Sequence, residues 1–205
     1  MDVSAAALWE WTKIFVRSPR TASALVKAQH LPINVSVIMI ALAGVMSGAM
    51  TGVLQAVNGV SSMVVDLPDG QQATITEGGA LIQGAAAIFF GLALGLAIFQ
   101  IGRRMGGTGS LAQILSLVAL LQMVMTVIVV GRTVALLVLP PLGFGILIFG
   151  LYVFFRGLGH VVNVGHDLED MGKSAGVIAL SFLALFVGLF ILVAILGISP
   201  QGVVQ

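Results

Sequence analysis

Long stretches without charged residues dominate this sequence and decide its class. Residues 33–57 hold no charge at all, and between Leu111 and Phe155 only Arg132 is charged. A helix needs about twenty apolar residues to cross a hydrocarbon layer about 30 Å thick, and both stretches offer that length. Charged residues make up 8% of the chain, against about 25% in soluble domains. The sequence therefore predicts an all-α integral membrane protein.

The apolar segments predict a bundle of five transmembrane helices. We expect the spans near residues 33–57, 80–102, 111–131, 140–159 and 174–198. Together they make one domain, 33–198, between an N-terminal segment, 1–32, and a short tail, 199–205. Pro140 and Pro141 cannot donate backbone hydrogen bonds, so they mark the turn and the start of the fourth span.

The N-terminal segment is too polar to span a membrane but has the pattern of interfacial helices. Trp9 and Trp11 lie among charged residues, and tryptophan favours the boundary between membrane and water. Ser18-Pro19 ends this first helix, and Pro19 is suited to the first position of a second. We interpret both as amphipathic helices anchored at the membrane surface. A helix that docks a partner is the alternative.

The connection between the first two spans, residues 58–79, predicts a small β-hairpin. Two β-prone runs, 61–67 and 71–76, flank Pro68-Asp69-Gly70. Proline fixes the first corner of such a turn, and glycine permits its close.

Lysine and arginine residues predict the orientation of the bundle. With five spans, Arg132 falls on one side and the other eight basic residues fall on the opposite side: Lys13, Arg17, Arg20, Lys27, Arg103, Arg104, Arg156 and Lys173. Cytoplasmic loops carry an excess of lysine and arginine. We therefore predict a cytoplasmic N-terminus, and a hairpin and C-terminus on the outer, periplasmic side.

Small residues mark faces on which helices can approach closely. Gly44, Gly48 and Gly52 share one face of the first span, and Gly91 and Gly95 share a face of the second. Bare backbone at such positions is a main source of packing energy in lipid. We favour packing within one chain. Homodimerisation through the first span is the alternative.

A glycine-rich turn joins the second and third spans. Arg103 and Arg104 end the second span at its cytoplasmic boundary, and Gly106 and Gly107 open the turn. The turn is too short to hold a nucleotide and lacks the lysine of a phosphate-binding loop. Ser110 is suited to cap the third span.

Polar residues near or within the spans are the candidate functional groups. Gln122 lies inside the third span, where we expect a hydrogen bond to another helix and keep contact with a solute as the alternative. His160 and His166 lie in a stretch with three glycines, which we interpret as a solvated cytoplasmic loop or a partner-docking patch. His166 and Asp170 would share one face of a continuous helix, so a metal site is a weaker alternative.

Several of these features together resemble a known family. They are the Gly-Gly-x-Gly-Ser turn at 106–110, Gln122, the Leu-Pro-Pro at 139–141, Lys173 before the last span, and Ser18-Pro19-Arg20. The combination looks like the bacterial branch of the Yip1 membrane-protein family. The resemblance implies about five membrane helices, a cytoplasmic N-terminus and location in the bacterial inner membrane.

Eukaryotic members of that family act with small GTPases in early secretory traffic, whereas bacterial members have no generally assigned biochemical role. The eukaryotic Asp-Leu-Tyr-Gly-Pro signature is absent here, because the only tyrosine is Tyr152. The resemblance therefore does not extend to a GTPase partner.

These observations favour a non-enzymatic protein that organises the membrane or holds partner proteins. The expected partners are the lipid bilayer and other membrane proteins or a second copy of the chain. A small-solute transporter or channel component is the alternative. The spans offer no buried His, Asp, Glu or Cys as a base or nucleophile, and we expect no cofactor. Nucleic acid is not an expected partner, because the nine basic residues are dispersed among eight acidic ones.

Overall fold

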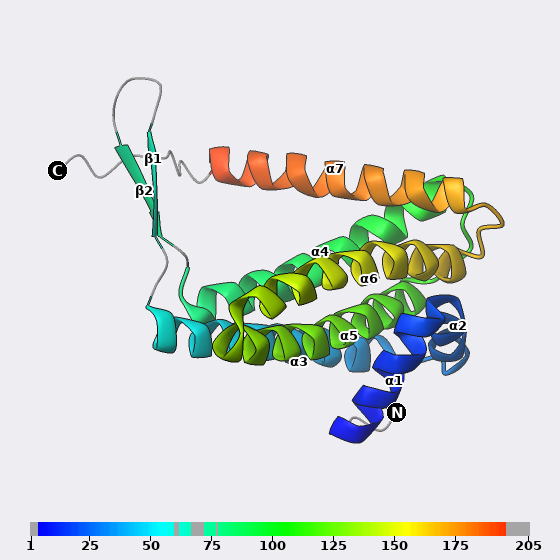
Figure 1. The fold of residues 1–205 in the computed structure, drawn as a ribbon. Helices are drawn as coiled ribbons and strands as arrows, with labels where there is room; N and C mark the ends of the chain where they lie inside the picture. The colour runs from blue at the N-terminus through cyan, green and yellow to red at the C-terminus, as the bar shows by residue number, and fades with distance from the viewer. Residues whose placement is uncertain (1–3, 60–61, 67–71, 77, 196–205) are drawn as a thin grey trace.

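The structure, a computed structural model, describes residues 4–59, 62–66, 72–76 and 78–195. Within these residues the chain forms helices joined by short turns, with one hairpin between the third and fourth helices (Figure 1). The elements in chain order are α1 (Ala5–Arg17), α2 (Pro19–Ala28), α3 (Ile33–Asn58), β1 (Ser62–Asp66), β2 (Gln72–Thr76), α4 (Ala80–Arg104), α5 (Leu111–Val138), α6 (Pro140–His166) and α7 (Met171–Ile195). The helices α3 to α7 are the five that are long and apolar enough to cross a membrane, so the predicted bundle is confirmed.

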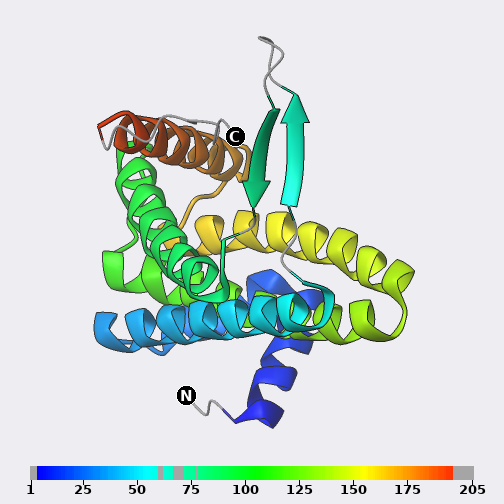
Figure 2. The same cartoon turned by 90° about the vertical axis from the view of Figure 1, so that its left-hand side faces the viewer.

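The five long helices alternate in direction, which gives the bundle two different ends (Figures 1 and 2). One end, which we call the basic end because most lysine and arginine residues lie at it or toward it, carries α1, α2 and the turns after α4 and α6. The hairpin end carries β1, β2 and the turn between α5 and α6. The central helix is α5, which contacts α1, α2, α3, α4 and α6 and has 56% of its most apolar window buried. In contrast, α7 contacts only α4 and α6 among the described elements, and 6% of its window is buried.

Two short helices at the N-terminus have one face packed into the basic end. Ser4 caps α1 by accepting a hydrogen bond from the Ala7 backbone, and Pro19 is the first residue of α2, as its sequence predicts. Phe15 of α1 is 1% exposed and lies against Gly157 of α6. Trp9 remains 55% exposed, so α1 has one buried and one open face, as an amphipathic helix requires.

Arg156 of α6 fastens α1 to the bundle. Its Nη1 donates a hydrogen bond of 2.8 Å to the carbonyl of Val16, and its Nη2 one of 3.4 Å to that of Arg17. These are carbonyls at the end of α1 that lack partners within the helix, and the negative end of the helix dipole favours a cation there. The arginine thus stabilises the point at which α1 meets α6.

Glycines bring α3 and α4 into backbone contact. A Cβ on Gly48 would lie 2.5 Å from the Ala80 carbonyl oxygen, and one on Gly44 would lie 2.9 Å from the Gly84 carbonyl oxygen. A Cβ on Gly52 would meet the Cβ of Ala80 at 3.1 Å. The face of α3 that carries these glycines is therefore occupied by α4 of the same chain. Self-association through it would require α4 to be displaced.

Two helices extend beyond their predicted ends. The third span was expected to end at residue 131, but α5 continues through Arg132 to Val138, so Arg132 lies inside a helix. The fourth was expected to end at 159, but α6 continues to His166. Glycine weakens a helix by about 1 kcal/mol relative to alanine, which made a loop plausible. In the structure the side chain of Phe15 packs against Gly157, and that of Ile114 packs against Gly165. These two contacts stabilise the helix.

The remaining boundaries follow the sequence more closely. Pro140 and Pro141 occupy the first two positions of α6. The strands β1 and β2 pair antiparallel from Ser62 opposite Thr76 to Asp66 opposite Gln72, which agrees with the predicted hairpin. The expected Pro68-Asp69-Gly70 turn and the predicted tail, 199–205, lie outside the described residues.

Candidate functional site

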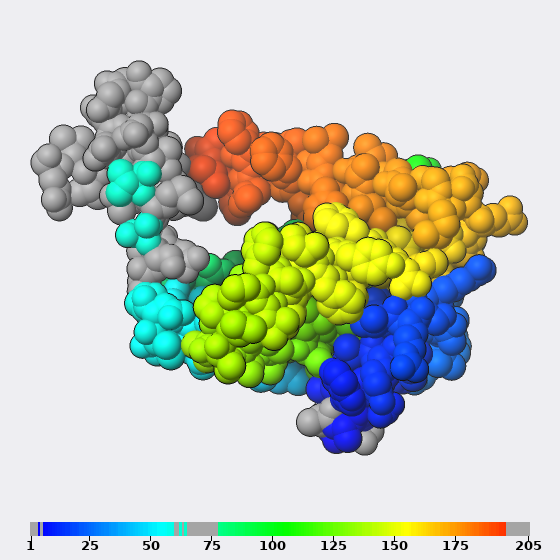
Figure 3. Space-filling model, in the orientation of Figure 1, coloured from blue at the N-terminus to red at the C-terminus, as the bar shows by residue number. Residues whose placement is uncertain are grey.

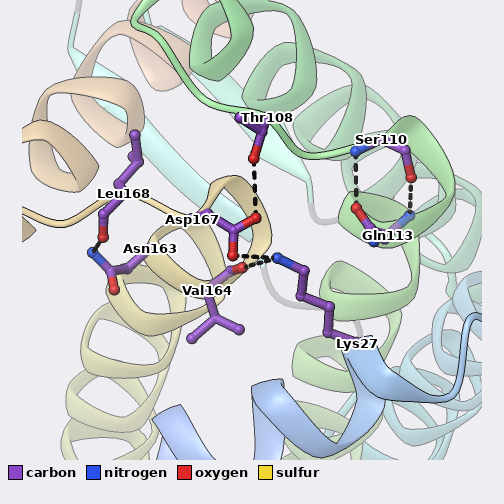
Figure 4. Close-up of polar contacts among 8 residues, drawn as sticks. All are labelled: Lys27, Thr108, Ser110, Gln113, Asn163, Val164, Asp167 and Leu168. Atoms are coloured by element: carbon purple, nitrogen blue, oxygen red, sulfur yellow. Dashed lines mark hydrogen bonds and ion pairs between the residues drawn. The ribbon is translucent and has the colours of Figure 1, made fainter.

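Polar side chains from four segments meet at the basic end, in a cluster that we call the polar junction. They come from α2, the turn after α4, the last turns of α6 with the residue that follows them, and the first turn of α7. Figure 4 draws Lys27, Thr108, Asn163 and Asp167. The members are Lys27, Thr108, Asn163, His166, Asp167 and Ser174. Lys27 and Asp167 are 140 residues apart in sequence, so only the fold brings them together.

His166, the last residue of α6, points into the protein and is fully buried, at 0% exposure. Its Nε2 lies 3.0 Å from the carbonyl oxygen of Ile98 in α4. Because a carbonyl only accepts hydrogen bonds, the imidazole Nε2 is the donor. The prediction that this residue lies in a solvated cytoplasmic loop is wrong. The ring joins α6 to α4 instead.

Glycines in the last turn of α4 and in the glycine-rich turn leave space for this imidazole. A Cβ on Gly102, Gly107 or Gly109 would lie closer to His166 or its neighbour Gly165 than real Cβ atoms approach. Gly106 has a positive φ of 92°, a conformation that glycine adopts without strain. The backbone N–H of Thr108 then donates to the carbonyl of His166 at 3.0 Å. The glycines therefore make room for a side chain from another helix.

Lys27, Thr108 and Asp167 form the polar side of the junction. The Lys27 Nζ donates to Asp167 Oδ1 at 2.6 Å and to the Val164 carbonyl at 2.8 Å, while Thr108 Oγ1 donates to Asp167 Oδ2 at 3.0 Å (Figure 4). The hydrogen bond from Lys27, assisted by that from Thr108, holds the pKa of Asp167 below its usual range. Lys27 also places a positive charge at the C-terminus of α6, where the helix dipole favours it.

Asn163 connects α6 to α7. Its side-chain Nδ2 donates to the Leu168 carbonyl at 2.6 Å and to Ser174 Oγ at 3.2 Å. Its backbone carbonyl accepts a hydrogen bond from the Leu168 N–H at 3.0 Å. Asp167 allows this reversal by taking a left-handed conformation with φ of 53°, which aspartate tolerates better than most residues. The turn between the two helices is thus held by side-chain bonds.

The turn after α4 ends in a complete helix cap. Ser110 Oγ accepts from the Gln113 backbone at 3.3 Å, and Gln113 Oε1 accepts from the Ser110 backbone at 3.0 Å. This reciprocal pair satisfies two donors that a helix start leaves unpaired, and it confirms Ser110 as the cap. Arg103 and Arg104 precede the turn with exposed side chains, and the Arg103 guanidinium lies 5.7 Å from the centre of the Phe99 ring.

Gln122 lies away from the junction, at the contact of α5 with α4. Its Nε2 donates to the Ala87 carbonyl at 3.4 Å, which is the expected kind of interhelical bond. The side chain fits because Gly91 faces it without a Cβ, and Gly95 similarly admits Leu115. Its Oε1 is buried without a hydrogen-bond partner in the structure. It borders a cavity of about 200 Å³ between α3, α4, α5 and α6.

His160 does not join His166. It is half-buried six residues earlier on α6, and its Nδ1 has no hydrogen-bond partner in the structure. The metal alternative required His166 and Asp170 on one continuous helix, but α6 ends at His166 and the ring turns inward to Ile98. Among the described residues, no three His, Cys, Asp or Glu side chains are grouped to hold a metal ion.

Sequence reasoning missed most of the polar junction. Lys27 was used only to predict orientation, and Ser174 and the side chain of Thr108 were not considered. Asn163 and Asp167 were noted only as neighbours of His160 and His166 in the predicted solvated loop or docking patch. One signal was present: the glycines on both sides of Thr108 indicate that something bulky lies against the turn. The sequence does not say that it is His166.

One comparison with known proteins identifies a match. The sequence profile of the Yip1 domain matches residues 13–195. No curated protein and no solved structure matches the chain. The matched range extends from within α1 to the end of α7, so it contains all five membrane-spanning helices and the whole polar junction.

Proposed function

The chain belongs to the Yip1 family, and from this premise we propose that it is a non-enzymatic membrane-organising protein that holds partner membrane proteins against its helices. It is a multi-pass protein whose spans lie in a lipid bilayer. The partners would be other membrane proteins or a second copy of the chain.

The observation that carries this proposal is the open face of α7. This helix is the most apolar of the five, with a mean hydropathy of 3.0, yet it has the fewest buried positions. A gap separates its second half from α6 in the space-filling view (Figure 3). Phe186 and Phe190 on that half are 70% and 71% exposed. Helices associate in lipid through packing, and the second half of α7 offers an exposed apolar surface for it.

The polar junction supports the same role by fixing the base of α7. Its bonds go largely to backbone carbonyls near helix ends: Lys27 to Val164, Asn163 to Leu168, and His166 to Ile98. Such bonds set the relative positions of the elements they join. A helix anchored at one end and open along the other half is suited to receive a partner span.

We further propose that the basic end faces the cytoplasm and that the membrane is a bacterial inner membrane. Eight of the nine lysine and arginine residues lie at or toward the basic end, and Arg132 lies in the hairpin-end half of α5. The excess of positive charge on cytoplasmic segments supports this orientation. The hairpin would then lie on the outer side.

Site-specific photocrosslinking in native membranes tests the proposal. A photoreactive phenylalanine analogue at position 186 or 190 should form protein adducts of discrete mass. The same analogue at Phe144 of α6, which is 64% exposed, is the matched control and should give few or none. Absence of protein adducts at both α7 positions, or an equal pattern at Phe144, would refute the role of α7.

A second candidate, a small-solute transporter or channel component, is favoured by the cavity beside Gln122. Its lining includes Ser47 and Thr126, and the unpartnered Gln122 Oε1 could accept a hydrogen bond from a solute. Uptake by reconstituted vesicles that is lost in Gln122→Leu but retained in Phe186→Leu would support this candidate over the first.

A further inference from the structure

A second cavity lies beneath α1, on the side of the bundle formed by α3 and α5. We call it the α1 cavity. It has a volume of about 310 Å³, whereas an engineered apolar cavity of about 150 Å³ suffices to bind benzene. Its lining is Leu8, Trp9, Leu42, Ala43, Met46, Met123, Thr126, Val127 and Val130. The one hydroxyl among these, on Thr126, donates to the Gln122 carbonyl at 2.9 Å, so the lining is apolar in effect.

The α1 cavity is open to the side and lies at the depth of lipid tails. Trp9, Leu42 and Met46 on its rim are 55%, 43% and 36% exposed. The last turns of α1 lie at the level of Arg156, whose guanidinium bonds to its carbonyls. From there α1 slopes toward the hairpin end, away from the bundle axis (Figure 1). Leu8 and Trp9 in its first two turns therefore line the cavity together with α5 residues as far along as Val130, past the middle of that helix.

Basic side chains continue from the mouth of this cavity toward the membrane surface. Lys13 and Arg17 follow Trp9 at intervals of four residues, so the three share one side of α1, and Arg17 lies about 12 Å along the helix from Trp9. Arg20 is exposed in the first turn of α2. Glu10 forms an ion pair with Lys13 at 2.7 Å, which offsets that charge. Within the described part of the chain, no ion pair occupies Arg17 or Arg20.

We propose that this surface binds one anionic phospholipid from the leaflet at the basic end. One acyl chain occupies the α1 cavity, and the phosphate lies beside Arg17 and Arg20. The two chemistries are arranged in the order that a phospholipid requires, with an apolar slot at tail depth and cations nearer the surface. A transmembrane helix, about 10 Å wide, does not fit a slot already bounded by α1, α3 and α5. The bound lipid would fill the space between α1 and the bundle.

Tryptophan quenching by brominated lipids tests this binding directly, since the chain has two tryptophans and both lie in α1. A Trp11→Phe background leaves Trp9 as the reporter. The full chain is reconstituted in phosphatidylcholine vesicles that contain equal mole fractions of brominated phosphatidylglycerol or brominated phosphatidylcholine. We expect stronger quenching by the anionic lipid. An arginine near an anionic surface changes affinity by about fivefold, so Arg17→Gln with Arg20→Gln should abolish the preference. Arg104→Gln, at the same end but on α4, should retain it.

A second pair of variants tests the cavity. Val127→Phe fills it, whereas Val134→Phe adds the same bulk on the lipid-facing side of α5, where Val134 is 57% exposed. Quenching by the anionic lipid should fall in Val127→Phe and stay at the parent level in Val134→Phe, with helical content by circular dichroism equal in both. Equal quenching by the two lipids in the parent would overturn the proposal. So would an equal response of the two phenylalanine variants. Neither result bears on partner binding by α7.

Discussion

The packing of the polar junction can be tested by adding a single methyl group at Gly102. Replacing it with alanine would place a Cβ against the buried imidazole of His166. Overpacking of this kind costs about 1–3 kcal/mol, and displacement of the ring would also weaken its bond to Ile98, worth about 1 kcal/mol. The gain in helix propensity, about 1 kcal/mol, offsets part of this. We expect a net loss of about 1–3 kcal/mol of unfolding free energy.

Thermal unfolding in mild detergent, followed by circular dichroism, measures this loss. For a chain of this size 1 kcal/mol corresponds to about 2–4 °C in Tm, so a loss of about 1–3 kcal/mol in Gly102→Ala should lower Tm by about 2–12 °C. Gly188→Ala is the control: it makes the same change within helix α7, where a Cβ would meet no atom within 4 Å. Its Tm should be unchanged or rise by up to about 4 °C.

A double variant separates this mechanism from general damage to α4. In Gly102→Ala with His166→Ala the clash is absent, so the loss in the double variant should be smaller than the sum of the two single losses. Groups in contact show such coupling, whereas distant ones add. Equal effects of Gly102→Ala and Gly188→Ala, or strict additivity with His166→Ala, would refute the packing argument.

Three further predictions concern the polar junction, the attachment of α1 and the orientation of the bundle. The pKa of Asp167 is lowered in the folded protein, so its pairing with Lys27 stabilises the fold at pH values above the ordinary aspartate pKa of about 3.9, and this contribution is lost as pH falls through the lower pKa of the folded state. The free energy of unfolding of Asp167→Asn should lack this loss at acid pH. Identical pH profiles of the variant and the parent would contradict the prediction. Arg156→Gln should weaken the attachment of α1, because charged hydrogen bonds are worth about 1.5–3 kcal/mol, and limited trypsin digestion should cut α1 faster than in the parent; an unchanged rate would show that Phe15 packing alone holds the helix. Since the chain has no cysteine, Gln29→Cys should resist a membrane-impermeant maleimide in intact cells while Leu139→Cys reacts; the reverse pattern would invert the proposed orientation.

The helix class and most element starts were readable from local chemistry. Twenty apolar residues suffice to identify a span wherever they occur. Pro19 and Pro140 begin helices because a proline lacks the N–H that an interior position would need. The Ser110–Gln113 cap likewise depends on residues three apart. Such signals need no knowledge of the rest of the chain.

The helix ends at Val138 and His166 were not readable in this way. Gly157 and Gly165 favour a break when considered alone, but the structure uses their bare backbone to admit Phe15 and Ile114. The polar junction was hidden for a related reason. The pairing of Lys27 with Asp167 joins residues 140 positions apart, and no local pattern connects them.

What the sequence by itself determined is therefore the membrane class, the number of spans and the chemistry of their starts. Only the tertiary structure decided which faces meet: Gly48 with Ala80, Gln122 with Gly91, and His166 with the glycine-rich turn. The physical reason is the solvent. In water an apolar stripe marks the buried face of a helix, but a helix in lipid is apolar on all sides, so its buried face is set by shape and by a few polar contacts that appear only when the helices are assembled.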